Sequence, residues 1–162
     1  QSIVELLDLY PTLCDRAGLP IPAHCEGSSF KDILNDPQHK GNNVAVSQFP
    51  NPALREWAAN PLSFGMRQTF FGPLIEQVEG RIIAQVGDAW DREFFENDLM
   101  GYAPRTDGYR LVVWRDRRDK NAAAVYVELY NHKTDPDETV NVASQRPELV
   151  AQLMARLRAE LE

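Results

Sequence analysis

The stretch RTDGYRLVVW, residues 105–114, decides the fold of this chain. Its Asp107-Gly108 pair separates two apolar-containing runs, residues 100–106 and 109–114, and such a two-residue link predicts a β-hairpin. We expect a type I′ turn, which needs positive φ at both central residues. In the second run the side chains alternate between two faces: Tyr109, Leu111 and Val113 on one, Arg110, Val112 and Trp114 on the other.

Two more strands are predicted to extend this hairpin into a sheet. Residues 125–130 form a further apolar run, and residues 44–49 form a shorter candidate that ends at Pro50 and Pro52. The charged residues 115–120 are expected to form a connecting loop. The pattern therefore favours a small antiparallel sheet of three to four strands.

The chain ends in a predicted helix. Pro147 suits the first helical position, and Glu148 suits the positive end of the helix dipole. The helix carries an apolar stripe at helical spacing: Val150, Leu153, Leu157 and Leu161. A small antiparallel sheet packed with a C-terminal helix is an α+β fold.

The first residues also carry helix signals. Ser2 and Glu5 have the spacing of a capping box, but Pro11 prevents one uninterrupted helix. We therefore expect a short turn followed by a helix that starts near Asp8, with Gly18 just beyond its end.

The middle of the chain is predicted to be a helical insert at about residues 54–98. Four apolar residues lie four positions apart on one helical face: Leu74, Val78, Ile82 and Val86. The expected organisation has two parts, a helix and loop over residues 1–43 and a subdomain over residues 44–162 that contains the insert.

Length and composition limit the class of protein. The chain has 162 residues, about one domain, of which 43% are hydrophobic and 25% are charged, as in ordinary soluble globular proteins. A formal net charge of −7 argues against general nucleic-acid binding, and an anionic substrate would need a local basic site. No stretch approaches the roughly 18 consecutive apolar residues of a membrane span. Because the sequence opens without Met, we expect a fragment or a processed chain.

Three groups of residues together resemble the C-terminal part of a sulfatase of the alkaline-phosphatase-like superfamily. They are DLYPTL with AGL (8–13 and 17–19), RTDGYR (105–110), and ELYN with TDPDET and NVA (128–131, 134–139 and 141–143). Each is weak alone, but their order and spacing extend over nearly the whole chain. The resemblance implies that residues 1–43 belong to the end of the catalytic domain and residues 44–162 to the C-terminal subdomain.

Two further stretches resemble the iduronate-2-sulfatase-like group. They are SQFP, residues 47–50, and MGY, residues 100–102. The sequence departs from that group at Asn51, where the group often has Arg, and in the length of the insert. The sugar substrate and the position of its sulfate therefore stay open.

The resemblance implies the hydrolysis of sulfate monoesters by a formylglycine nucleophile and calcium. The family makes the formylglycine from the first residue of a C/S-x-P-x-R motif, and neither Cys14 nor Cys25 is followed by that pattern. We therefore expect no catalytic residue, no metal site and no cofactor in this chain, with calcium and formylglycine in a missing N-terminal part. The two cysteines are either two thiols or a single bridge.

The resemblance also implies that the loop after residue 47 reaches the rim of the active site. The residues there that are able to hydrogen-bond to a sugar, pair with an anion or stack on a sugar ring are Gln48, Arg55, Trp57 and Arg67. These four are the candidate substrate-binding residues. The alternative is that Trp57 belongs to the core and both arginines are solvated.

Weaker candidates have structural explanations that we favour. An acidic group suggests calcium, but a turn with local side-chain bonds fits it better: Asp135, Asp137 and Glu138. Three histidines without ligand spacing are interpreted as surface or satisfied residues: His24, His39 and His132. The basic residues within 115–120 could contact a glycan, but Asp116 and Asp119 partly neutralise them, which favours a solvated loop.

The resemblance therefore implies that this chain is part of a sulfuric ester hydrolase that acts on a sulfated carbohydrate. Its expected partners are the N-terminal catalytic part and a sulfated saccharide, without nucleic acid or membrane. The alternative is a non-catalytic carbohydrate-binding or interaction module. The compartment stays open, because periplasmic, secreted and lysosomal locations all suit the family.

Overall fold

The computed structural model describes residues 2–36, 38–39, 41, 44–50, 72–119 and 121–161. The chain divides into two compact units. The first unit comprises Gln1–Ser47, Tyr102–Val112 and Val127–Glu162, and the second comprises Gln48–Gly101 and Val113–Tyr126. Because the units are discontinuous in sequence, side chains far apart in the chain come together within each.

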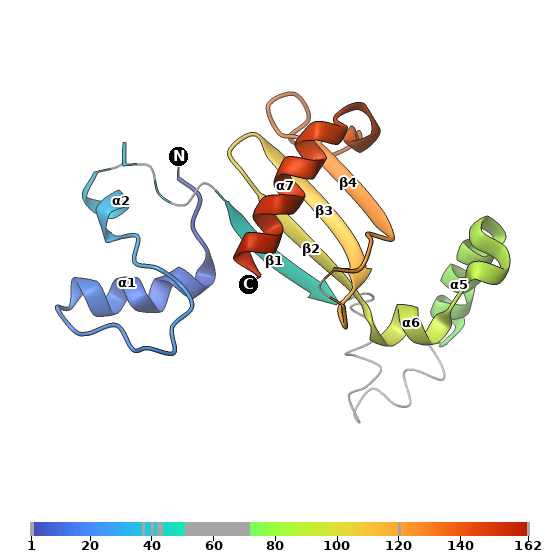
Figure 1. The fold of residues 1–162 in the computed structure, drawn as a ribbon, viewed down its shortest axis with the longest axis horizontal. Coiled ribbons are helices and arrows are strands. Elements are labelled where there is room, and N and C mark those ends of the chain that lie inside the picture. Colours follow the sequence, from blue (N-terminus) through green and yellow to red (C-terminus); the bar gives the residue numbers. More distant parts are fainter. Residues whose placement is uncertain are drawn as a thin grey trace. The chain divides into compact units, whose positions relative to one another are not determined.

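The strands form one four-stranded antiparallel sheet in the order β1-β2-β3-β4 (Figure 1). Their bounds are Ala45–Pro50 for β1, Leu99–Arg105 for β2, Tyr109–Asp116 for β3 and Tyr126–Asn131 for β4. Successive strands are neighbours, so the sheet has no crossover. The predicted hairpin, both additional strands and the α+β class are confirmed.

The hairpin is closed in a different way from the predicted one. Thr106 donates its backbone N–H to the carbonyl oxygen of Tyr109 at 2.8 Å, and its Oγ1 accepts the Tyr109 N–H at 3.1 Å. Among the described residues only Gly18, Gly87 and Glu138 have positive φ. Asp107 and Gly108 are not among them, so the type I′ prediction is wrong. In this turn the Thr106 side chain is the acceptor for the Tyr109 N–H.

The core lies between the sheet and α7, Pro147–Glu160, which lies across one face of the sheet (Figure 1). Leu111 of β3 and Leu129 of β4 are fully buried, and so, almost completely, are Leu153 and Leu157 of α7. Burial alternates along β3, as the sequence pattern predicted. This interface buries Leu153 and Leu157 of the apolar stripe, whereas Val150 and Leu161 are half-buried.

The N-terminal segment begins with a short 3₁₀ turn, Leu6–Asp8, followed by α1, Leu9–Arg16. The predicted start near Asp8 is confirmed, and Gly18 has a φ of 68° just after the helix. The predicted capping pair is wrong, because Glu5 donates its N–H to Oδ2 of Asp8 at 3.0 Å, whereas the Ser2 hydroxyl contacts the carbonyl of His39 at 3.4 Å.

Two buried polar side chains hold the following loop against α1. Asp8 accepts the Ser28 N–H at 2.8 Å, and Thr12 Oγ1 accepts the Phe30 N–H at 3.0 Å. The loop then enters α2, Lys31–Asn35. The side chain of Glu5 accepts the N–H of Val46 at 2.7 Å, which connects this segment to the start of β1.

The insert is helical where it is described. It contains α5, Gly72–Val86, a 3₁₀ turn at Gly87–Ala89, and α6, Arg92–Asn97. In the described part of the chain, no helix combines the length and apolar character needed to span a membrane.

Candidate functional site

The four predicted substrate-binding residues are only partly covered by the structure. Gln48 lies in β1 with an exposed side chain. Arg55, Trp57 and Arg67 lie outside the described residues. Their grouping at the rim of an active site therefore stays a prediction.

The described residues contain two free thiols and no assembled metal-ligand group. Cys14 is buried in α1, Cys25 is half-buried in the loop that follows, and neither forms a disulfide. Across the described ranges, no three His, Cys, Asp or Glu side chains come together in a way that could hold a metal ion.

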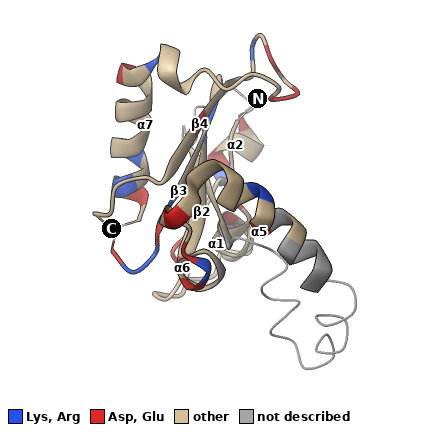
Figure 2. Ribbon diagram, turned by 90° about the vertical axis from the view of Figure 1, so that its right-hand side faces the viewer, with Lys and Arg blue, Asp and Glu red and all other residues tan. Residues whose placement is uncertain are grey.

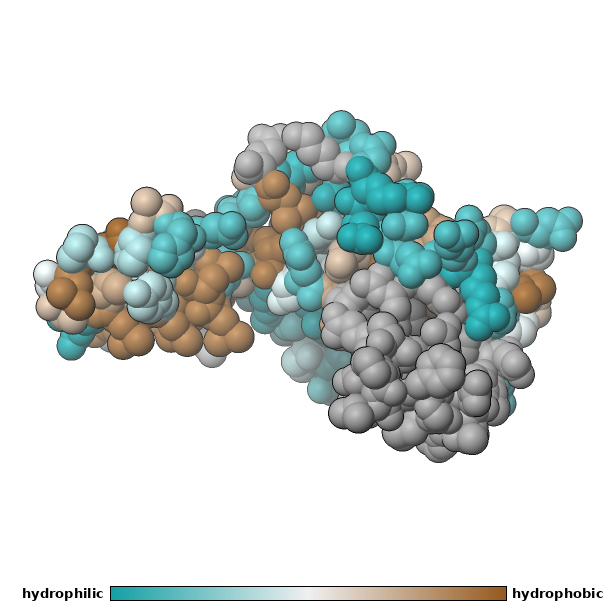
Figure 3. All heavy atoms as spheres, turned by 90° about the horizontal axis from the view of Figure 1, so that it is seen from below, coloured by the Kyte–Doolittle hydropathy of each residue, from teal (hydrophilic) through white to brown (hydrophobic). Residues whose placement is uncertain are grey.

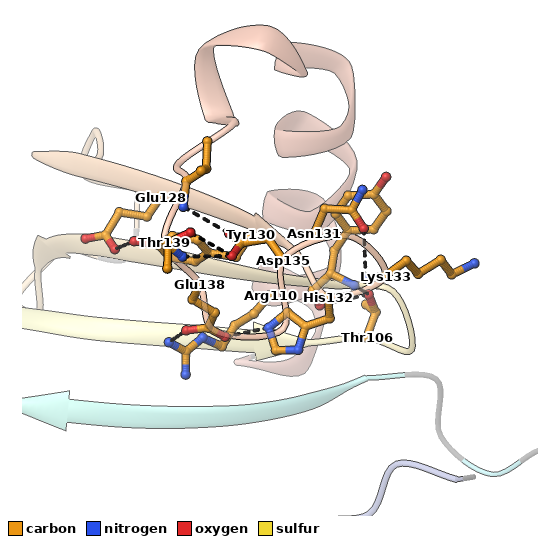
Figure 4. A network of polar contacts seen from close by, with 12 residues as sticks. Thr106, Arg110, Glu128, Tyr130, Asn131, His132, Lys133, Asp135, Glu138 and Thr139 are labelled. Carbon is orange, nitrogen blue, oxygen red and sulfur yellow. Dashed lines mark hydrogen bonds and ion pairs between the residues drawn. The ribbon is translucent and has the colours of Figure 1, made fainter.

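A compact polar network occupies the end of β4 and the connection that follows it (Figure 4). The carboxylate of Glu138 forms an ion pair with Arg110 of β3, and its second oxygen lies 2.5 Å from Nε2 of His132. The side chains of Glu138 and His132 are 16% and 18% exposed. Glu138 has a φ of 55°, so the backbone adopts a left-handed conformation where the carboxylate joins Arg110 and His132.

Asp135 organises the turn beside this network. Its carboxylate accepts the backbone N–H groups of Thr139 at 3.0 Å and Val140 at 2.9 Å, and it also accepts the Thr139 hydroxyl. The backbone N–H of Thr139, followed by that of Val140, lowers the pKa of Asp135. These bonds support the interpretation of the acidic group as a locally bonded turn.

Asn141 connects the same turn to the sheet and to the 3₁₀ turn, Ala143–Gln145, that precedes the last helix. Its Oδ1 accepts the N–H of Leu129 and the N–H of Ala143, both at 3.0 Å. The residues from 128 to 143 that carry the family resemblance therefore fix the path from β4 to α7.

The basic loop after β3 is neutralised by nearby carboxylates. Arg118 pairs with Asp98 at 3.0 Å and with Asp116 at 2.7 Å, and Arg117 lies 3.8 Å from Asp98. Hydrogen bonds from Arg118 lower the pKa of Asp116. The preference for a solvated loop over a glycan contact is supported by these pairs.

The second unit contains an open apolar groove of about 520 Å³. Its walls include Trp90, Phe94, Phe95 and Trp114. The rings of Trp90 and Phe95 pack with centroids 4.9 Å apart, and Nε1 of Trp90 donates to Glu79 at 2.8 Å. We call this surface the aromatic groove.

Sequence reasoning did not predict this groove. The one signal for it was the alternation along residues 109–114, which places Trp114 on the strand face opposite Leu111 and Val113. That pattern does not specify which residues outside the strand lie beside Trp114.

Curated relatives of this chain are sulfatases. Arylsulfatase K of Xenopus laevis is 26% identical over 98% of this chain and 22% of its own length. Iduronate 2-sulfatase of Homo sapiens is 27% identical over 88% of this chain and 25% of its own length. No family model matches. This chain therefore spans about a quarter or less of these relatives.

Solved structures with a similar fold include a putative sulfatase of Bacteroides thetaiotaomicron, with a TM-score of 0.52, 23% identity, and coverage of 93% of this chain and 23% of that one. A second solved structure is described with the metabolism of multiple glycosaminoglycans by the same organism. It has a TM-score of 0.50 and 16% identity, and the match covers 94% of this chain and 26% of that one. At these identities the likeness concerns the fold. Together with the order of the sequence motifs, these similarities relate the chain to the sulfatases, as a counterpart of the C-terminal part of the iduronate 2-sulfatase-like group.

Proposed function

We propose that this chain is part of a sulfatase that hydrolyses sulfate monoesters of a sulfated carbohydrate. The observation that carries the proposal is the similarity to arylsulfatase K and iduronate 2-sulfatase, which extends over 88% to 98% of this chain. Because the chain spans only 22% to 25% of these relatives, the activity is assigned to a longer polypeptide in which this chain is the C-terminal part.

An exposed apolar surface in the first unit supports this partnership. Leu6, Leu13 and Leu19 are 86%, 66% and 60% exposed. Figure 3 shows hydrophobic residues on the molecular surface in brown. Nearby large apolar side chains are also exposed: Val4, Leu7, Leu9, Tyr10 and Ile21. Apolar surface gathered in this way marks a protein interface, and its proposed occupant is the N-terminal catalytic part. Residues 1–43 would then complete the catalytic domain.

The chemistry of the substrate fixes what each part would contribute. A sulfate ester is an anion, so a hard cation and nearby basic groups must offset its charge. The implied calcium and formylglycine would supply that offset and the nucleophile from the catalytic part. This chain would contribute pocket shape and specificity through Gln48, Arg55, Trp57 and Arg67, which are suited to hydrogen bonding, ion pairing and stacking on a sugar ring.

The test compares this chain alone with the polypeptide that includes the sequence encoded upstream of Gln1. We expect the longer polypeptide to hydrolyse an aryl sulfate in the presence of calcium, and the isolated chain not to do so. An upstream sequence without a C/S-x-P-x-R motif, together with an isolated chain that is a stable monomer and binds a saccharide, would overturn the proposal in favour of a carbohydrate-binding module.

A matched pair of variants tests the proposed interface in the longer polypeptide. Leu13→Asp places a charge on the exposed apolar surface and should lower the melting temperature, whereas Leu13→Met keeps the side chain apolar and should leave it nearly unchanged. Equal stability of the two variants would show that this surface faces solvent.

A further inference from the structure

The aromatic groove has the size and lining of a site for an apolar side chain. Its volume of about 520 Å³ lies within the range of ligand-sized pockets. Phe94, Phe95, Leu99 and Trp114 line it, and the indole N–H of Trp90 is already used by Glu79. Asp91 and Tyr126 bring polar groups to a lining that is otherwise apolar and aromatic, so the chemistry favours an apolar occupant.

The charges around the groove are negative. Asp91 lines it, and the side chains of Asp88 and Glu93 are exposed nearby on the same stretch of chain. Figure 2 marks acidic residues on this helical stretch around α6. Among the described residues that line the groove, none is Lys or Arg. This acidic rim disfavours an anionic ligand and favours a cationic one.

The nearest basic side chains do not reverse that charge. Arg92 lies 3.6 Å from Glu79, and Arg117 and Arg118 pair with Asp98. Arg81 is exposed on α5 but does not line the groove. The groove therefore combines an apolar floor with a rim that complements Lys or Arg.

Exposed apolar residues continue the floor of the groove outward. Val125 and Tyr126 are 61% and 57% exposed, and Val86 on α5 is 48% exposed. All three line the groove. An apolar hollow that continues into exposed apolar surface suits a protein segment better than an enclosed small molecule.

We propose that the aromatic groove receives an apolar side chain of the sulfatase's catalytic part, on a segment that carries Lys or Arg beside it. The inference rests on the proposed function, because the relatives are about four times as long as the matched region and supply the remaining polypeptide. The acidic rim and the open apolar floor favour this occupant over the sulfated saccharide, which is an anion.

Site-specific photo-cross-linking in the longer polypeptide tests the inference. p-Benzoylphenylalanine in place of Val86 should form cross-links to a segment upstream of Gln1 that has an apolar residue and Lys or Arg within one helical turn. The same probe in place of Gln152, which is exposed on α7, is the control and should not label that segment. Cross-links confined to residues 44–162, or to an upstream segment without basic residues, would overturn the inference.

A charge-reversal pair separates the acidic rim from the apolar floor. Asp88→Lys with Glu93→Lys should lower the cross-link yield at position 86 severalfold, whereas Asp88→Asn with Glu93→Gln should lower it less. Equal yields in both pairs would overturn the charge assignment. Hydrolysis of an aryl sulfate is measured in the same preparations, so an active enzyme without the cross-link refutes only this inference, whereas an inactive polypeptide refutes the proposed function.

Discussion

The ring of Trp114 lies against the backbone of Gly101, so that a Cβ atom added to Gly101 would come within 2.8 Å of Cζ3 and 3.0 Å of Cη2. Gly101 is buried in β2, and its neighbour Trp114 forms one wall of the aromatic groove. The absence of a side chain at position 101 is therefore what allows the indole to occupy its position.

Gly101→Ala should destabilise the protein by about 1–3 kcal/mol, because the added methyl group overpacks a buried contact. The free energy of unfolding in urea measures the effect. Gly80→Ala is the matched control: nothing lies within 4 Å of a Cβ there, and the residue is inside α5. The control should stabilise by about 0.5–1 kcal/mol. If Gly80→Ala lowers the free energy of unfolding as much as Gly101→Ala does, this account of Gly101 is contradicted.

Glu138 combines a left-handed backbone with two side-chain partners, and substitution separates these effects. Glu138→Ala and Glu138→Gly both remove the carboxylate that joins Arg110 and His132, so both should be destabilising. Because φ is 55°, Ala should be less stable than Gly by about 1 kcal/mol. Thermal unfolding of the two variants measures the difference. If Glu138→Ala is at least as stable as Glu138→Gly, the left-handed backbone conformation is not retained.

Asp135 makes stability depend on acid pH. Its pKa is lowered from 3.8 in the folded state, chiefly by the backbone N–H of Thr139. A carboxyl group with a lowered folded pKa contributes stability that is present above its unfolded pKa and is lost as the pH falls through the folded one. Asp135→Asn should therefore reduce the loss of melting temperature below about pH 4.

Other carboxyl groups also contribute to the loss of melting temperature at acid pH, and one of them provides the control for that experiment. Asp15 and Asp116 also have lowered pKa values, chiefly through hydrogen bonds from Lys31 and Arg118 respectively. Asp15→Asn should also reduce the loss of melting temperature at acid pH. Its effect should add to that of Asp135→Asn, because the two carboxyl groups share no hydrogen-bond partner. A pH profile unchanged in Asp135→Asn would mean that the Thr139 and Val140 bonds do not form in solution.

Much of the fold was predictable because it follows from short-range periodicity. The alternation along residues 109–114 predicted the strand and its two faces, and the stripe that includes Leu153 and Leu157 predicted the last helix. The turn type was not predictable from Asp107-Gly108 alone, since the Thr106 hydroxyl replaces a backbone acceptor. Gly108→Ala should accordingly have a small effect, because the nearest atom to a Cβ there is the flexible Lys133 Cε at 3.4 Å.

Features that depend on distant residues were harder to predict. Asp8 was expected only to mark a helix start, yet it also binds the N–H of Ser28, twenty positions away in sequence. The aromatic groove requires Trp90 and Trp114 to line one hollow, which no local pattern specifies. The predicted domain boundary at residues 43–44 and the roles of Arg55, Trp57 and Arg67 remain predictions.

The proposed specificity role of Arg55 and Arg67 can be separated from bond breaking. In the longer polypeptide, Arg55→Ala or Arg67→Ala should raise KM for a sulfated oligosaccharide by about ten- to a hundredfold, because a charge-assisted hydrogen bond contributes about 1.5–3 kcal/mol. An aryl sulfate does not extend to the rim, so its kcat/KM should be nearly unchanged. Arg81→Ala is the matched control, since Arg81 is exposed on α5 and is not a predicted substrate ligand. Equal losses on both substrates would indicate a folding defect, and no loss on either would return both arginines to the solvated surface. Selective loss on the oligosaccharide would assign this chain a part in choosing the substrate, while the nucleophile and the metal stay with the catalytic part.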